Sequence, residues 1–386
     1  MDIKIIKRAT NYNFKQTSTY YSDDSSIKLS IGGKSVPNLV ETTIPLSNLT
    51  NKDWMENNLF DIKGIWIYDS EHLPTPSFTY QTVIDTQEQF LALNDNTLFG
   101  EYILNCDIDL IENTSFKIMG NYGVFNGNGH IIRNYTLKES EYENIYALFQ
   151  TNHGIIKNLG IENLNIGFTA RKKMVAGAGL IYENYGIVNS CYVKGSISIS
   201  NIDGDAIAGG IVAISKGGKV LNSYSDVSVY ACSTSDVLVS CYAGGIIATG
   251  EGVVENCYSL KGVSSKAHYA QGTIFSAYGI SGADGIVKNS FVLSNVSVSQ
   301  YSSTSEYQIG GISKEYENSF AYEWQTITKL EEDLSFGDKS YEELCSATFL
   351  ESLDFKLFIS EEDLVENNNN VWIISETNLP KLWFEK

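Results

Sequence analysis

Apolar and polar positions in the middle of the chain follow a pattern that repeats about every thirty-three residues. Its clearest marker is a glycine that opens five segments, each with a β-branched residue two positions later. The segments are 154–160, 186–192, 218–224, 252–258 and 285–291, and their glycines lie 32, 32, 34 and 33 residues apart. A sixth, degraded copy ends at Phe320. Each repeat holds about three short strand-like runs and no helix-length amphipathic run, so the pattern predicts short strands.

Equivalent positions of the repeat carry similar side chains. The fourth position after the leading glycine is Asn158, Ser190, Asn222, Asn256 and Asn289 in successive copies. The sixth position is aromatic in the last four copies: Tyr192, Tyr224, Tyr258 and Phe291. A run of alternating serine and isoleucine follows at Gly195–Ser200, which is typical of a strand with one buried face.

These features predict an all-β fold, a right-handed parallel β-helix over residues 81–322. One repeat cannot bury its apolar face alone, whereas stacked repeats share one core and pair their backbones about 4.8 Å apart. Equivalent residues then lie above one another, so we expect the asparagines to hydrogen-bond between coils and the rings to stack. A β-propeller is the less favoured alternative, because a blade needs four strands in about 40–50 residues.

The two ends of the chain depart from the repeat. A short helix is predicted at Thr86–Leu93, with Thr86 as N-cap and Gln89 completing a capping box, and it should close the first coil. Residues 323–386 are acidic and less repetitive, with helix expected near 341–350, and we interpret them as a C-terminal cap. Residues 1–80, with strand-like runs at 27–31 and 62–68 and a Pro-containing linker at 73–76, are predicted to be a separate β module for attachment.

Composition narrows the classes of partner. The chain has 46 acidic and 27 basic residues and a net charge of -19, which disfavours nucleic acid. Aromatic residues make up 12% of the chain, so it should fold despite its acidity. No apolar run reaches the length of a membrane span, and the first ten residues lack the apolar core of a signal peptide. The six cysteines form no CxxC pair and are expected to be buried thiols.

No catalytic, cofactor-binding or metal-binding residue is predicted. The carboxylate pairs Asp107 with Asp109 and Asp203 with Asp205 are candidates for glycosidase acids, but their strand and turn positions favour structural roles. The histidines have no obvious nucleophilic partner for a triad. The segment 201–206 has oxygen ligands at alternating positions but lacks the downstream glutamate of an EF-hand loop. A weak calcium site in this segment is therefore kept as an alternative.

Longer stretches of the sequence resemble a known repeat family. The segments GGIVAISKGGKVLNSYSDVSV (209–229) and GGIIATGEGVVENCYSLKGV (244–263) are similar to the GLUG motif repeat of bacterial surface and phage-associated proteins. The lead-in at 101–110 and 123–137 and the ending at 371–384 also resemble that family, so the likeness covers about 81–386. It implies a parallel β-helix used as a stalk, an adhesin or a tail part, and it implies no particular ligand.

Binding is expected on three longer connections between coils, 167–177, 230–240 and 263–270, because loops on a rigid scaffold commonly carry function. Aromatic side chains in these connections, together with Tyr242 just after the second one, are suited to stack on sugar rings. They are Tyr230, Tyr242, His268 and Tyr269.

The function expected from these features is a non-enzymatic, receptor-binding part of a phage tail or tail-like particle, such as a tail fibre or baseplate protein. Residues 1–80 would bind other tail proteins, the solenoid would bind a glycan or protein of the host surface, and a homotrimer is one arrangement to test. The protein would then reside in the virion. The alternatives are a secreted adhesin of the bacterial surface and a polysaccharide-degrading β-helix enzyme.

Overall fold

The computed structural model describes residues 81–111, 115–137, 144–235, 239–267, 274–300, 306–323, 325–329, 332–335, 337–357, 370–375 and 377–385, together with short strands before residue 81. The chain divides into two compact units, residues 1–80 and 81–386. In the first unit, β1 (Tyr20–Ser22) pairs in parallel with β4 (Thr42–Ile44). Two antiparallel pairs join β2 (Ser30–Ile31) to β3 (Lys34–Ser35) and β5 (Trp66–Ile67) to β6 (Thr75–Pro76).

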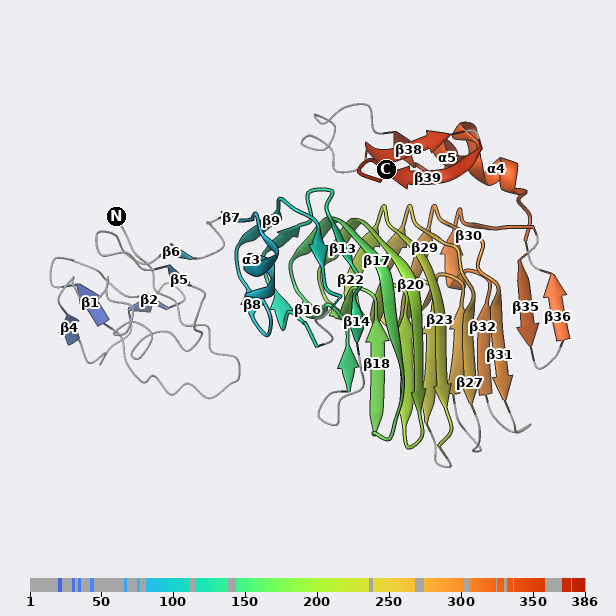
Figure 1. Ribbon diagram of the computed structural model, residues 1–386, viewed down its shortest axis with the longest axis horizontal. Coiled ribbons are helices and arrows are strands. Elements are labelled where there is room, and N and C mark those ends of the chain that lie inside the picture. Colours follow the sequence, from blue (N-terminus) through green and yellow to red (C-terminus); the bar gives the residue numbers. More distant parts are fainter. Residues whose placement is uncertain are drawn as a thin grey trace. The chain divides into compact units, whose positions relative to one another are not determined.

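The second unit is a parallel β-solenoid of about six turns, which confirms the predicted fold class (Figure 1). Its opening coils hold β7 (Gln81–Ile84), β8 (Thr97–Leu98), β9 (Glu101–Leu104), β10 (Ile108–Asp109), β11 (Gly120–Asn121), β12 (Val124–Asn126), β13 (Ile131–Arg133), β14 (Thr136–Leu137) and β15 (Ile145–Tyr146). The next coils hold β16 (Phe149–Asn152), β17 (Ile155–Ala170), β18 (Met174–Ala178), β19 (Ile181–Asn184), β20 (Ile187–Asn201), β21 (Asp205–Gly209), β22 (Val212–Leu221), β23 (Tyr224–Ser233) and β24 (Ser240–Gly244).

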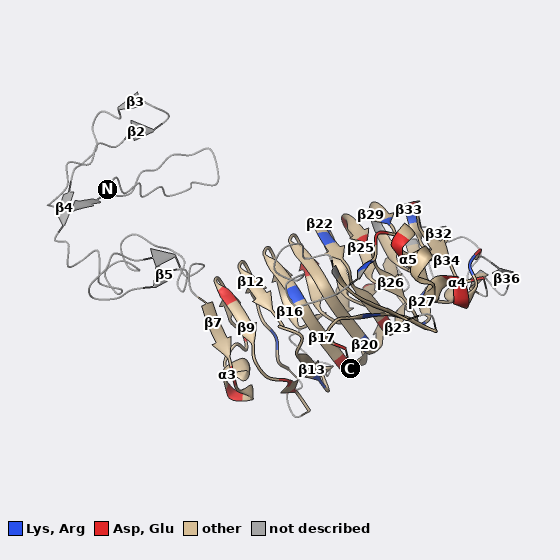
Figure 2. Cartoon of the chain, turned by 90° about the horizontal axis from the view of Figure 1, so that it is seen from above, with Lys and Arg blue, Asp and Glu red and all other residues tan. Residues whose placement is uncertain are grey.

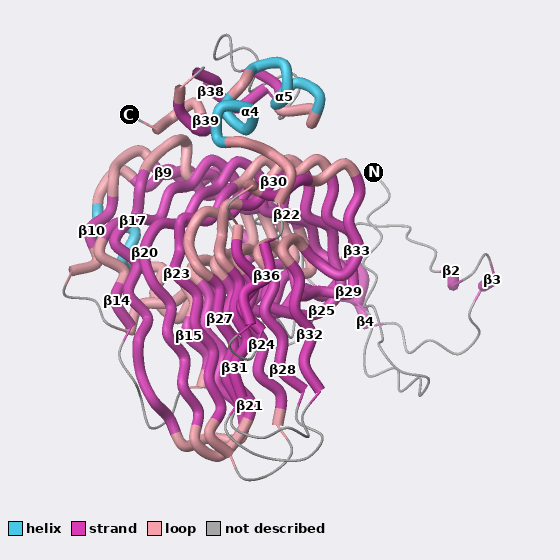
Figure 3. Tube along the Cα trace, turned by 90° about the vertical axis from the view of Figure 1, so that its right-hand side faces the viewer, coloured by secondary structure: helices cyan, strands magenta, loops and turns pink. Residues whose placement is uncertain are grey.

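The last coils follow the same path with shorter strands. They hold β25 (Ile247–Glu255), β26 (Tyr258–Ser259), β27 (Val263–Ala267), β28 (Ile274–Tyr278), β29 (Ser281–Lys288), β30 (Phe291–Val292), β31 (Val296–Gln300), β32 (Glu306–Gly310), β33 (Ser313–Glu317), β34 (Phe320–Ala321) and β35 (Thr326–Lys329). Most strands belong to one 24-stranded sheet, and β15, β18, β21, β24, β28 and β32 form a second, six-stranded sheet. The tube in Figure 3 shows these strands following one another from coil to coil.

The register of the coils explains the repeat. Ile156 pairs with Val188, Val188 with Val220, and Val220 with Val254, so the β-branched column points into one core and is at most 1% exposed. The leading glycines sit where the adjacent coil leaves no room for a side chain. A Cβ at Gly186 would lie 2.1 Å from the carbonyl oxygen of Gly154, which no side chain can tolerate.

The asparagine column turns the chain at a corner of each coil. Asn158, Asn222 and Asn256 have φ values of 53°, 46° and 53°, in the left-handed region that asparagine tolerates better than most residues. Their side chains also join coils. Asn256 donates to Asn222 at 3.3 Å, and Asn222 donates to Asn189 at 2.9 Å. A separate stretch of this ladder links Asn318 to Asn289 at 2.8 Å.

Helix α3 (Gln87–Leu91) begins at the first coil with the predicted capping box between Thr86 and Gln89. Its buried Phe90 stacks on Phe116, with ring centroids 4.8 Å apart. At the other end, β35 pairs with the antiparallel strand β36 (Glu332–Ser335), which ends the run of parallel strands. The free edges of the solenoid are thus met by a helix on one side and a hairpin on the other.

The rest of the C-terminal segment turns back along the side of the coils. It contains α4 (Tyr341–Cys345), α5 (Ala347–Ser352), β37 (Lys356–Leu357), β38 (Asn370–Ser375) and β39 (Asn378–Leu382). Figure 1 shows these elements above the row of coils, and Figure 3 shows the same layer seen along the stack. Residues 323–386 are predicted to cap the last coil, and the β35–β36 hairpin lies at that end, but the buried Leu344, Leu350 and Trp372 pack beside the aromatic column.

Candidate functional site

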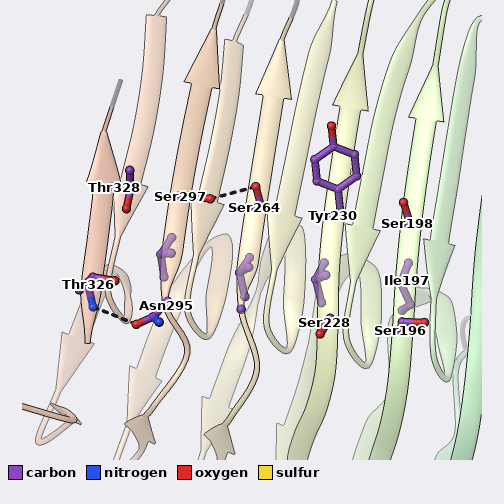
Figure 4. Close-up of a pocket in the computed structure, with 14 residues that line it drawn as sticks. Ser196, Ile197, Ser198, Ser228, Tyr230, Ser264, Asn295, Ser297, Thr326 and Thr328 are labelled. Carbon is purple, nitrogen blue, oxygen red and sulfur yellow. Dashed lines mark hydrogen bonds between the residues drawn. The ribbon is translucent and has the colours of Figure 1, made fainter. Parts of the chain in front are cut away.

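A groove crosses the outer face of five successive coils (Figure 4). It has a volume of about 540 Å³ and runs across β20, β23, β27, β31 and β35. Its lining residues are Ser196, Ile197, Ser198, Ser228, Val229, Tyr230, Gly262, Val263, Ser264, Asn295, Val296, Ser297, Thr326 and Thr328. Because its length follows the stacking direction, any bound chain would lie across the strands.

Strand alternation places the groove's polar groups. Val229, Val263 and Val296 are buried in the core, so the residues on either side of each point outward. The backbone register then aligns one outward residue per coil in the row Ser198, Tyr230, Ser264, Ser297 and Thr328. A second outward row begins with the paired Ser196 and Ser228. The groove is therefore a regular array repeated at the coil spacing.

The array consists mainly of hydroxyl groups. Ser297 donates to Ser264 at 2.9 Å, and the amide nitrogen of Thr326 donates to the side-chain oxygen of Asn295 at 3.0 Å. The groove is not obstructed around Gly262, because a Cβ built there would have only one atom within 4 Å, a backbone oxygen at 3.7 Å. The ring of Tyr230 stands among the serines (Figure 4). Such a surface combines many donors and acceptors with one aromatic face.

The predicted binding residues are distributed differently from the expectation. Tyr230 lines the groove, but the prediction that it lies on a loop is wrong, because β23 continues through it to Ser233. Tyr242 also lies in a strand, β24 of the six-stranded sheet. The strand neighbours of both tyrosines, Val229 and Cys241, point into the same core, so Tyr230 and Tyr242 face opposite sides of the solenoid. His268 and Tyr269 lie outside the described residues.

The aromatic column forms a buried stack. Ring centroids are 5.3 Å apart for Tyr192 and Tyr224, 4.7 Å for Tyr224 and Tyr258, and 4.9 Å for Tyr258 and Phe291. Each of these residues is at most 3% exposed, because the C-terminal segment covers the column. The ring of Phe384 stacks on Tyr192 at 5.8 Å, so this column is part of the structural core rather than an open binding surface.

A second cleft, of about 580 Å³, lies where the C-terminal segment meets the opening coils. Its charged groups pair with one another. Asp107 accepts hydrogen bonds from Arg133 at 2.9 Å and from the backbone of Ile131 at 3.1 Å, and lies 3.1 Å from His130. Partial burial alone would raise the pKa of Asp107, but these hydrogen bonds outweigh it and hold the pKa below its usual value.

Glu385 closes the same cleft. Its side chain is 4% exposed and lies 2.9 Å from Lys194, and it also accepts hydrogen bonds from Tyr224 and the backbone of Leu382. Lys194 in turn lies 3.7 Å from Glu162. The ion pair of Glu385 with Lys194 therefore holds the C-terminal segment to the coils, which is a structural role.

The other candidate chemistry stays local. Asp109 accepts hydrogen bonds from Asn134 and from the backbone of Ile111, at 2.9 and 3.0 Å. Asp205 accepts a hydrogen bond from the backbone amide of Ser240 at 2.6 Å, and the side chain of Asp203 lies 3.5 Å from that of Arg171. Within the described part of the chain, no group of three or more His, Cys, Asp and Glu side chains could hold a metal ion, and no helix could span a membrane.

Two further side-chain columns were not predicted. A buried ladder links Asn121 to Asn152 and Asn152 to Asn184, both at 2.9 Å. Beside it, an outer stack runs through Tyr122, His153 and Tyr185, with centroids 4.4 Å apart at each step. The signal in the sequence for both columns is the one-coil spacing of their residues.

Comparison with known proteins gives a likeness of fold alone. A solved structure from Bacteroides ovatus, described as a "putative immunoglobulin A1 protease", superposes with a TM-score of 0.54 and 19% identity. The match covers 80% of this chain and 94% of the other. No family model matches the sequence, and no curated protein is significantly similar. The GLUG resemblance therefore stays a prediction, while the parallel β-helix is common to both structures.

Proposed function

We propose that this chain is a non-enzymatic, receptor-binding solenoid whose groove contacts a polymer on a cell surface. The observation that carries the proposal is the outward row from Ser198 to Thr328, which offers one polar side chain per coil across five coils. A rigid stack of coils keeps these groups in fixed positions, so a ligand binds without first ordering the site.

The wider assignment is a part of a phage tail or tail-like particle. In this proposal residues 1–80 attach to other tail proteins, and the solenoid carries the groove to the host. The separation of the chain into two compact units, 1–80 and 81–386, is compatible with one unit for attachment and one for binding. A surface adhesin would use the groove in the same way and differs only in what residues 1–80 bind.

Binding without catalysis is favoured by the positions of the carboxylates. Asp107 and Asp205 each form hydrogen bonds to a neighbouring coil, and the described part of the groove lining includes no carboxylate. Glycoside cleavage requires an acid and a second carboxylate on either side of the bond. The name of the Bacteroides ovatus structure makes proteolysis a reaction to assay, though 19% identity supports only the shared fold.

The proposal is tested by sedimenting the full chain with bacterial envelope preparations. The double variant Ser264→Arg/Ser297→Arg fills the groove with two long charged side chains and should lose binding. The matched control, Ser352→Arg/Ser375→Arg, places the same charges at exposed positions of α5 and β38 and should bind normally. Equal binding by the two double variants, or release of cleaved glycan or peptide by the unaltered chain, would refute the proposal.

A further inference from the structure

No charged side chain is among the described residues that line the groove, although the chain carries 46 acidic and 27 basic residues. Asp226, two residues before Ser228, lies 3.2 Å from Lys261, so these two charges neutralise each other. Along the coils in Figure 2, Lys, Arg, Asp and Glu occupy only scattered short stretches of otherwise tan ribbon. The lining therefore selects its ligand by hydroxyl and amide hydrogen bonds and by shape.

We propose that the groove binds a neutral, linear polysaccharide that lies parallel to the stacking direction, with about one sugar unit per coil. This inference rests on the proposed function and specifies the class of its ligand. Each serine or threonine hydroxyl both donates and accepts, as sugar hydroxyls do, so a run of them can exchange paired hydrogen bonds with successive sugars.

The spacing supports this orientation. Adjacent parallel strands lie about 4.8 Å apart, which is close to the advance per unit of an extended pyranose chain. The row Ser198, Tyr230, Ser264, Ser297 and Thr328 thus presents its groups in step with the polymer. The ring of Tyr230 offers an apolar face against which the C–H face of one sugar can pack, and this fixes the position of the chain along the row.

Other polymers fit less well. An anionic glycan would be repelled by a net charge of -19 and would find no cation to pair with among the lining residues that the structure describes. A polypeptide commonly binds a sheet by adding a strand at a free edge. The groove lies instead on the face of paired strands, whose backbone groups already bond to the neighbouring coils, as Val229 does to Gly262 at 2.9 Å.

The test is calorimetry of the full chain with neutral cello-, chito- and malto-oligosaccharides, from dimers to octamers, and with oligogalacturonates as the anionic series. One neutral series should bind, with an affinity that rises with length until the oligosaccharide spans the five coils and then levels off. Tyr230→Ala should weaken this binding about tenfold, as loss of an aromatic anchor does. Tyr230→Phe should retain it, and Tyr242→Ala, on the opposite face, serves as the control.

Three results would overturn the inference: preference for the oligogalacturonates, affinity that does not depend on length, or equal losses in Tyr230→Ala and Tyr242→Ala. The envelope assay separates this failure from failure of the proposed function. The double variant Ser264→Arg/Ser297→Arg could lose envelope binding while oligogalacturonate displaces the unaltered chain from envelopes. The receptor-binding role would then stand, and only the neutral ligand would be wrong. If the unaltered chain binds neither envelopes nor any oligosaccharide, both proposals fail.

Discussion

Tyr224 and Tyr258, one coil apart, stack with ring centroids 4.7 Å apart and an angle of 4° between the rings. Parallel in-register coils force this arrangement, because equivalent side chains leave the backbone in the same direction about 4.8 Å apart. The C-terminal segment then buries the stack, and the hydroxyl of Tyr258 donates to the carbonyl of Pro380. One column of rings therefore joins coil to coil and the coils to the end of the chain.

Replacing Tyr258 with alanine should lower the free energy of unfolding by about 3–5 kcal/mol, the usual effect of removing a buried aromatic ring. Tyr258→Phe keeps both stacking partners and loses only the hydrogen bond to Pro380, so it should cost about 1–3 kcal/mol. Chemical denaturation of the full chain measures both. If the two variants are equally stable, the stack contributes nothing beyond the hydroxyl group.

Asn222 combines two roles that substitutions can separate. It has a φ of 46° and takes part in the hydrogen bonds to Asn189 and Asn256. Asn222→Ala loses the bonds and strains the left-handed backbone, so it should be less stable than the unaltered chain by about 2 kcal/mol. Asn222→Gly loses the bonds but relieves the backbone and should be the more stable variant. The reverse order in thermal unfolding would show that backbone conformation is not the constraint.

Glu385→Ala should loosen the C-terminal segment. The carboxylate is almost fully buried and holds Lys194, so its removal should cost about 3 kcal/mol of local stability. Hydrogen exchange of residues 370–385 should become faster, while exchange in β20 and β23 should stay slow. The matched control is Glu317→Ala, because Glu317 pairs with Lys288 at 3.0 Å but is 64% exposed, and the expected effect is about 0–1 kcal/mol. Similar exchange in both variants would contradict the anchoring role.

Stability should fall in alkaline solution. Burial, and next the carboxylate of Glu162, raises the pKa of Tyr192, while burial, followed by Glu385, raises that of Tyr258. Burial also raises the pKa of the Cys191 thiol to about 12. Unfolded tyrosine and cysteine ionise near pH 10 and 8.5, so the unfolded state releases protons first. The stabilisation is complete below these values and is lost as pH rises toward the higher folded pKa values.

Thermal midpoints measured at increasing pH check this dependence. The midpoint should hold steady up to about pH 8 and decline above it as the unfolded thiols and then the phenols ionise. Tyr258→Phe removes one of the shifted groups, so its decline above about pH 10 should be shallower. A midpoint that stays constant through this range would contradict the burial of these groups.

The sequence was most informative where the coils repeat. Val188, Val220 and Val254 recur at the coil period because each must point into the same core, and the leading glycines recur because adjacent coils leave no room for a Cβ. The helix at α3 could also be predicted, since a capping box is a local signal that needs no tertiary contact.

Features that depend on distant contacts could not be predicted. Nothing near Glu385 in the sequence indicates that it meets Lys194, because that contact joins the last residues to an early coil. The groove also depends on contacts between residues that are distant in the sequence. Alternation at Gly195–Ser200 identifies one strand with outward serines, but only the register between coils aligns them with Ser264 and Ser297. The ring of Tyr230 marks it as a candidate in the sequence, and its position in a strand follows from alternation that continues to Ser233.

Hydroxyl-radical footprinting of the full chain, free and bound to bacterial envelopes, tests the central claim most directly. Tyr230 in the groove should be labelled more slowly in the bound protein, and peptides containing Ser264 and Ser297 should be protected with it. Tyr185, which is 43% exposed in the outer aromatic stack, and Tyr242 on the opposite face should be labelled at unchanged rates. Protection of Tyr185 or Tyr242 with unchanged labelling of Tyr230 would contradict the claim that the groove is the binding surface.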